Sequence, residues 1–157
     1  MNDNGENGEH VFTNLTDVLM APIGMRDDCM ITRLEGVGLQ WRRTATDILQ
    51  QTDPEGYALY RSVKYADGAT DNPDLATRRE GYKVAALRVL EQHFDHPLCE
   101  GWRQIAAKVV EALDPVAYAQ YRQVKYGAGD PDTATKIEAY ALVIERFLAL
   151  SYTVVNL

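Results

Sequence analysis

A tyrosine-rich segment that occurs twice constrains the fold of this chain more than any other feature. Residues 57–65 read YALYRSVKY and residues 118–126 read YAQYRQVKY, and an Asp-Pro pair precedes each segment. Nine of the thirteen positions from 53 to 65 are identical in residues 114–126, whereas unrelated sequences of average composition would share about one. The sequence therefore predicts that a structural unit is duplicated within the chain.

Composition indicates a folded protein with a single core. The chain has 157 residues, of which 46% are hydrophobic and 25% charged, and these fractions are ordinary for globular domains. No apolar run approaches the roughly 20 residues that cross a bilayer. Cys29 and Cys99 form no CxxC pair, and nothing near the start resembles a signal peptide. We expect a cytoplasmic, non-membrane protein.

Each copy is expected to begin with an amphipathic helix that a tryptophan heads. Side chains at i, i+4, i+7, i+8 and i+11 form one stripe along a helix in both copies. The stripe consists of Trp41, Ala45, Ile48, Leu49 and Thr52 in the first copy and of Trp102, Ala106, Val109, Val110 and Leu113 in the second. We interpret both tryptophans as core residues.

The second helix of each copy should start at its Asp-Pro pair. Asp53 and Asp114 can accept hydrogen bonds from the free N–H groups of a first turn, and the following proline has no N–H to leave unpaired. A third helix should start near Asp74 in the first copy and near Asp132 in the second. We expect it to end at His96-Pro97 in the first copy and to run through Tyr152 in the second.

The N-terminal region has no counterpart later in the chain. Residues 1–10 carry nothing apolar after Met1, which predicts a disordered tail. Helical periodicity suggests one short helix over 11–20 and another over 26–35, which Gly36 and Gly38 should end. We interpret these helices as a brace on the duplicated body.

The predicted fold is all-α. Two tandem three-helix units, related by internal duplication, should pack as one helical-bundle domain, because a unit of this size buries little surface alone. The expected segments are the tail (1–10), the N-terminal brace (11–38), repeat unit 1 (39–96) and repeat unit 2 (97–157).

Lys64 lies near the middle of the helix face that the two copies share. A buried and unpaired ammonium costs several kcal/mol, so Lys64 should reach water or meet a carboxylate. The candidate carboxylates recur in both copies as Glu80 and Glu138 and as Asp74 and Asp132. One interpretation is a structural network that clamps the second helix to the third, and it would include Glu80, Glu138, Tyr65 and Tyr126.

The other interpretation places part of the shared face outward as a binding surface. Its candidate residues are Tyr57, Tyr60, Arg61 and Lys64 in the first copy and Tyr118, Tyr121, Arg122 and Lys125 in the second. Tyrosine and arginine are common anchors of protein interfaces. The formal charge of −7 opposes binding to nucleic acid, whose phosphates dominate affinity.

Catalytic and metal-binding signatures are missing from the sequence. There is no GxSxG, P-loop or GxGxxG motif. His93, His96 and Cys99 could approach a metal, but the second copy offers no matching ligands. We therefore expect neither a metal nor a cofactor, and assign no catalytic residues.

Two functions follow as hypotheses from different classes. The first is a non-catalytic helical-repeat protein that acts as an interaction, adaptor or regulatory module for a partner protein, and that also self-associates as a homo-oligomer. The alternative is a binding protein or enzyme for a small anionic ligand, with a polar Tyr/Arg/Lys/Glu pocket between the repeat units.

Overall fold

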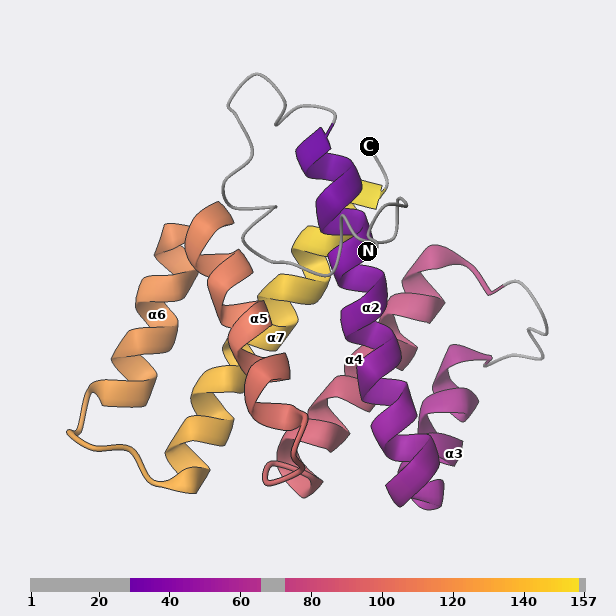
Figure 1. Cartoon of the computed structure of the whole chain (residues 1–157), viewed down its shortest axis with the longest axis horizontal. Helices are drawn as coiled ribbons and strands as arrows, with labels where there is room; N and C mark the ends of the chain where they lie inside the picture. The colour runs from indigo at the N-terminus through magenta and orange to yellow at the C-terminus, as the bar shows by residue number, and fades with distance from the viewer. Residues whose placement is uncertain (1–28, 66–72, 156–157) are drawn as a thin grey trace, which may run out of the picture.

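The computed structural model describes residues 29–65 and 73–155, and these residues form six α-helices and no strand, packed as a bundle (Figure 1). The all-α prediction is confirmed. The helices are α2 (Cys29–Thr52), α3 (Pro54–Lys64), α4 (Leu75–Gln92), α5 (Cys99–Leu113), α6 (Pro115–Tyr126) and α7 (Thr133–Val155). The predicted tail and the first predicted short helix lie outside the described residues. Within those residues, no helix has the length and apolar character needed to cross a membrane.

The predicted helix starts are confirmed. Asp53 accepts a hydrogen bond from the Gly56 N–H at 2.9 Å, and Asp114 accepts one from the Ala117 N–H at 3.1 Å. Proline follows each aspartate as the first helical residue. Asp74 and Asp132 make the equivalent bonds at the starts of α4 and α7, at 2.7 and 2.8 Å. These four carboxylates therefore satisfy backbone donors that a helix start leaves free.

The predicted helix break at Gly36 and Gly38 is wrong, because α2 runs through both glycines without interruption. Both residues are buried. A Cβ on Gly38 would lie 3.0 Å from the Cβ of Ser151 in α7. The glycine therefore permits a close crossing of two helices, and tertiary packing outweighs its low helix propensity. The predicted boundary between the brace and repeat unit 1 thus falls inside one helix.

Two other predicted helix features are also corrected. Helix α4 ends at Gln92 rather than at His96-Pro97, since His93 leaves helical geometry and its ring is held by Asp53 at 2.8 Å. The last members of the two tryptophan-headed stripes, Thr52 and Leu113, are exposed rather than buried. Both lie in the last turn, where the next helix starts within two residues and the chain turns away from the core.

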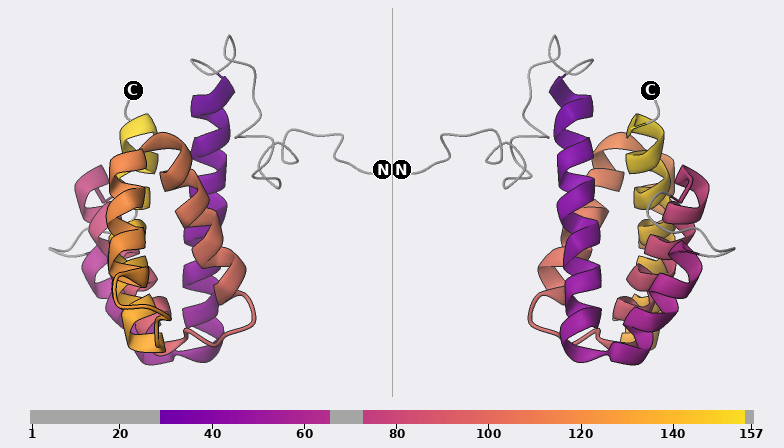
Figure 2. Two further views of the ribbon diagram at one scale, coloured as in Figure 1. Left: turned by 90° about the vertical axis from the view of Figure 1, so that its left-hand side faces the viewer. Right: turned by 90° about the vertical axis from the view of Figure 1, so that its right-hand side faces the viewer.

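The helices form two layers, with α2 and α5 on one side and α3, α4, α6 and α7 on the other (Figure 2). Helix α3 packs on α4 and α6 packs on α7, while α4 and α7 meet in the centre. The layer of α2 and α5 is joined by Trp41 and Trp102, whose rings stack at 4.2 Å with planes 7° apart. Each indole N–H donates to the main-chain carbonyl of the other tryptophan, at 2.7 and 3.0 Å.

Candidate functional site

The lysines of the repeated segments lie between pairs of tyrosine hydroxyls. The Lys64 ammonium donates to the hydroxyls of Tyr60 at 3.0 Å and of Tyr82 at 3.1 Å, which joins α3 to α4. Lys125 makes the corresponding bonds to Tyr121 at 2.9 Å and Tyr140 at 3.0 Å, which joins α6 to α7. We call each set a Tyr–Lys–Tyr bridge. Because an ammonium that reaches hydrogen-bond acceptors avoids much of its burial cost, phenols can replace a carboxylate here.

In the described part of the chain, the carboxylates that were expected to pair with these lysines form no ion pair with them. Glu80 and Glu138 are exposed, while Asp74 and Asp132 cap helices. Within residues 29–65 and 73–155, the hydrogen-bond partners of Lys64 are the two phenols. Of the expected alternatives, water or a carboxylate, the described residues therefore provide no carboxylate for Lys64 and two phenols in its place.

The pKa values of the two phenols in each bridge are shifted in opposite directions, one upward by burial and the other downward by hydrogen bonds and charge. Burial raises the pKa of Tyr60 and Tyr121 well above the ordinary value of a phenol. Burial would also raise the pKa of Tyr82 and Tyr140, but hydrogen bonds from the first tyrosine and from the lysine outweigh it and lower both. The Lys125 pKa is raised despite burial, since the surrounding phenols stabilise its charge. Lys125 therefore stays charged in the range where proteins function.

The eight candidate binding residues divide by exposure. Tyr60 and Tyr121 are core residues, only 5% and 4% exposed, and Tyr57, Tyr118 and the two lysines are half-buried. Arg61 and Arg122 are exposed, and their guanidinium groups lie over the rings of Tyr65 and Tyr126, at 4.7 and 5.0 Å from the ring centres. Tyr65 and Tyr126 thus position arginines that remain open to a ligand.

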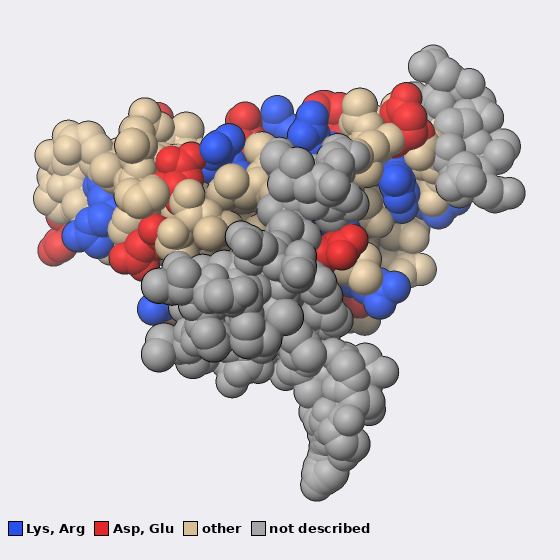
Figure 3. Space-filling model, turned by 90° about the horizontal axis from the view of Figure 1, so that it is seen from above, with Lys and Arg blue, Asp and Glu red and all other residues tan. Residues whose placement is uncertain are grey.

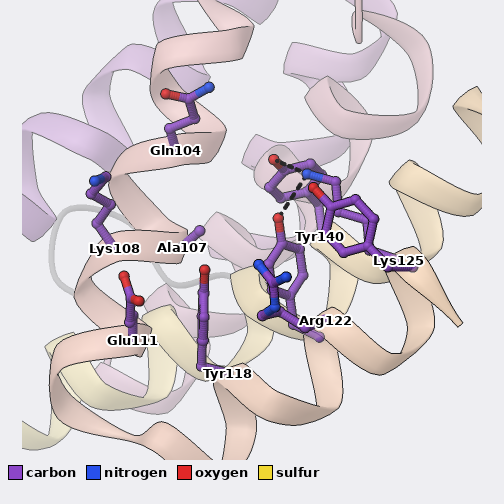
Figure 4. A pocket seen from close by; sticks show the side chains of 10 residues that line it. Gln104, Ala107, Lys108, Glu111, Tyr118, Arg122, Lys125 and Tyr140 are labelled. Atoms are coloured by element: carbon purple, nitrogen blue, oxygen red, sulfur yellow. Dashed lines mark hydrogen bonds between the residues drawn. The ribbon is translucent and has the colours of Figure 1, made fainter. Parts of the chain in front are cut away.

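Part of the second segment lines a pocket of about 330 Å³ between α5 and α6. Figure 4 shows the residues that line this pocket, with Gln104, Lys108 and Glu111 on α5 and with Tyr118, Arg122 and Lys125 on α6. The bridge of Lys125 with Tyr121 and Tyr140 forms one end of this pocket, as the dashed lines show. The pocket therefore combines fixed aromatic walls with three cationic side chains.

A smaller cavity of about 150 Å³ lies between α4 and α7, where the sequence predicted a polar pocket between the units. Its lining includes Arg79, Glu80, Lys83 and Glu145 but no tyrosine. Lys83 pairs with Glu145 at 3.7 Å. Because these charges are already partly paired, the α5–α6 pocket is the stronger candidate for a charged ligand.

His93, a candidate metal ligand in the sequence, contacts a helix cap instead. Its Nε2 lies 2.8 Å from Asp53 Oδ2, and the Arg88 Nε donates to the same oxygen at 2.7 Å. Hydrogen bonds from Arg88, then from His93, hold the pKa of Asp53 far below its usual range. No group of three metal-ligating side chains occurs among the residues described. Sequence reasoning missed Arg88, although its equivalent Arg146 binds Asp114 in the same way.

The sequence patterns also gave no role to two buried arginines, Arg42 and Arg103. Arg103 donates to the Phe94 carbonyl at 3.0 Å and to the Cys99 sulfur at 3.1 Å, and its guanidinium lies 3.7 Å from the Phe94 ring centre. Arg42 lies over Tyr82 at 5.4 Å, as Arg103 does over Tyr140 at 5.3 Å. The signal was available, because a Trp-Arg pair occurs at the same place in both copies.

Comparison of the chain with protein-family models, with curated proteins and with solved structures gave no significant match. The site must therefore be interpreted from its own chemistry. Seen from above, basic and acidic residues are interspersed on the described surface (Figure 3). The described part of this face presents no extended surface of one charge sign, so we expect the selection of a charged ligand to depend on local clusters of side chains.

Proposed function

We propose that α2–α4 and α5–α7 are two copies of one unit, packed about a pseudo-two-fold axis into one domain. Their sequence repeat supports this, as do three contacts that recur at equivalent positions. These are the capped Asp-Pro starts, the Tyr–Lys–Tyr bridges and the arginine on each capping aspartate. The reciprocal bonds of Trp41 and Trp102, which are 61 residues apart, would then lie on the axis.

We further propose that the protein acts without catalysis, by binding a partner protein at the α5–α6 pocket and the exposed arginine beside it. The observation that carries this proposal is the pocket itself, with Tyr118 and Arg122 on a rigid wall. Tyrosine and arginine supply much of the energy of protein interfaces. A side chain held in place before binding loses less entropy when the partner arrives.

The buried part of the repeated segment forms one end of the pocket and holds the exposed residues of the site in place. Tyr121 and Tyr140 are core residues, and Lys125 is fixed between their hydroxyls. Their packing sets the position of α6 against α7, and with it the direction in which Arg122 and Tyr118 face α5. Substitutions that test binding therefore belong at the exposed positions.

A capture experiment tests this function. The full chain is immobilised and bound proteins are compared with those bound by Arg122→Glu and Lys108→Glu, with Arg78→Glu as control. Arg78 is exposed on α4, outside the pocket, so it makes the same charge change elsewhere. We expect a partner that binds the wild-type and Arg78→Glu proteins but neither pocket variant. Identical capture by all four proteins would refute the pocket as the interface.

A small anionic ligand is the second candidate, because the volume of about 330 Å³ lies at the lower end of known small-molecule sites. Thermal-shift measurements against anionic metabolites address it. A ligand present at a hundredfold excess over its Kd adds about 2.7 kcal/mol to the native state. The absence of any such stabilisation would leave the partner protein as the occupant.

Self-association and a cytoplasmic location remain predictions from the sequence. Exposed apolar residues at the α5–α6 corner, Leu113 and Val116, are consistent with a homo-oligomer. Light scattering that gives a strict monomer at high concentration would exclude it.

A further inference from the structure

The α5–α6 pocket carries a positive excess on a chain that is negative overall. Lys108, Arg122 and Lys125 line it together with a single carboxylate, Glu111, whereas the whole chain has a formal charge of −7. Among the residues described, none of the three cations forms an ion pair. Within this part of the chain, no carboxylate neutralises these charges through an ion pair, and they favour an anion in the pocket.

The side chains around the pocket suit an oxyanion. The Arg122 guanidinium is exposed and can donate two parallel hydrogen bonds to a phosphate, which a lysine cannot do. The Tyr118 hydroxyl and the Gln104 amide supply further donors from opposite walls (Figure 4). Lys125 is already bonded to two phenols, so it contributes mainly through its charge.

The amount of charge distinguishes a phosphate monoester from a carboxylate. Three cations and one carboxylate leave a local charge of about +2, and a phosphate monoester carries about −1.5 to −2 at pH 7. A carboxylate would neutralise only half of the excess. The aromatic walls formed by Tyr118 and Tyr126 also offer a surface on which an aryl group can stack.

We propose that this pocket binds the phosphate monoester of a phosphorylated side chain on the partner protein. The proposal rests on the proposed function, since it assumes that a partner protein docks at α5 and α6. Arg122 forms the bidentate contact with the phosphate, and Lys108 contributes a positive charge from α5. Lys125, held by Tyr121 and Tyr140, supplies the fixed positive charge at the inner end. Glu111 opposes binding and limits the affinity for the phosphate.

The first experiment is an NMR titration of the full chain with phenyl phosphate, using phenol and sodium sulfate as comparison probes. We expect phenyl phosphate to shift the backbone amides of α5 and α6 near the pocket, and phenol to leave them unchanged. Arg122→Gln should weaken the binding of phenyl phosphate about tenfold, since hydrogen bonds to charged groups are among the strongest in proteins. Lys108→Gln should weaken it less, and Arg78→Gln should have no effect.

Glu111→Gln provides a variant that should gain affinity. Removing the carboxylate of Glu111, the one carboxylate among the described residues that line the pocket, should strengthen the binding of phenyl phosphate about twofold to fivefold, in line with the energy of exposed charge pairs. A gain cannot arise from misfolding, so it separates a binding effect from damage to the fold. If Glu111→Gln and Arg122→Gln both behave like Arg78→Gln, the pocket does not bind phosphate. Equal shifts by sulfate and phenyl phosphate would also overturn the proposal, in favour of unspecific anion binding.

A second experiment identifies the source of the phosphate. Phosphotyrosine peptides, their unphosphorylated forms and glucose 6-phosphate are compared by calorimetry with the wild-type protein. We expect the phosphorylated peptides to bind most tightly, because they add contacts along α5 and α6. Tighter binding of glucose 6-phosphate would overturn the assignment to a partner side chain.

Phosphatase treatment of the lysate before the capture experiment separates this inference from the proposed function. Loss of the captured partner after treatment supports both. If the partner still binds and still depends on Arg122, then the interface is correct and the phosphate assignment is wrong.

Discussion

The α2–α4 half has a glycine at its α3–α4 crossing, where the α5–α7 half has an alanine at the corresponding sequence position. Gly81 corresponds to Ala139, and its missing Cβ would lie 2.9 Å from the Lys64 Cα across the α3–α4 crossing. Gly56 corresponds to Ala117, and a Cβ there would lie 2.6 Å from Asp53 Oδ2 in the cap of the same helix and 3.0 Å from the Arg88 Cγ of α4. The hydrogen-bonded bridges recur in both halves, whereas the glycine at the α3–α4 crossing occurs in the first half alone.

The two halves also differ beside their repeated segments. Lys108 and Glu111 line the α5–α6 pocket, and the residues at the same positions of α2 are Asp47 and Gln50. Between the two halves, the core residues and the Tyr–Lys–Tyr bridges are similar, whereas these exposed positions differ. This division is expected when shared residues maintain the fold and the exposed ones determine what each half contacts.

The largest effect should come from removing the inner tyrosine of either bridge. Tyr60→Ala and Tyr121→Ala should each lower the free energy of unfolding by about 3–5 kcal/mol, the usual cost of truncating a buried aromatic side chain. Denaturant unfolding monitored by circular dichroism measures both. Similar losses would show that the two bridges are equivalent. A loss below about 1 kcal/mol in one variant would mean that its half does not depend on the bridge.

Exchanging glycine and alanine at the helix crossings should have an intermediate effect. Gly81→Ala should cost about 1–3 kcal/mol, because the added methyl group meets the backbone of α3 and forces the helices apart. Ala139→Gly should cost about 1–2 kcal/mol, because it lowers helix propensity and also removes a fully buried methyl group. Unfolding curves of the two variants provide the test. A stabilised Gly81→Ala protein would contradict a close contact at the α3–α4 crossing.

The smallest effect concerns acid stability. Hydrogen bonds from Arg88 and His93 lower the pKa of Asp53, and a backbone hydrogen bond and Arg146 lower that of Asp114. A carboxyl whose pKa is lower in the folded state stabilises the protein above its unfolded pKa of about 3.9, and this contribution disappears as the pH falls. Asp53→Asn should therefore make the free energy of unfolding depend less on pH between about pH 5 and pH 2.

Asp114→Asn serves as the matched control for that measurement. Asp114 is more exposed than Asp53, with side-chain exposures of 21% and 9%, and it has no histidine partner among the described residues. The Asp114→Asn substitution should therefore reduce the loss of stability at low pH less than Asp53→Asn does. Urea midpoints recorded at several pH values give both slopes, and equal slopes would show that the additional bond from His93 has no energetic weight.

Local chemistry made part of this structure predictable. The Asp-Pro starts could be located because the cap depends on residues within one turn, and the tryptophan stripes because helical periodicity is a local property. The bond from Lys64 to Tyr60 also spans only one turn. Its other partner, Tyr82, comes from α4, and spacing along the chain cannot show which side chains two helices bring together.

The incorrect predictions arose where tertiary contacts overrule local preference. Gly36 and Gly38 were interpreted as helix breakers, but α2 continues through them because Gly38 lies against Ser151 of α7. The sequence, which did not favour His93 as a metal ligand, also gave no sign of its contact with Asp53, which lies 40 residues away. The pocket could not be anticipated either, since its walls come from α5, α6 and Tyr140 of α7.

The stacked indoles have a spectroscopic consequence. Trp41 and Trp102 are the only tryptophans of the chain, and their rings lie parallel at 4.2 Å with α2 on one side and α5 on the other. Chromophores this close share their excited states, so the ultraviolet dichroism and emission of the protein report on one contact between distant parts of the chain. Separation of α2 from α5 would change that signal without any added label.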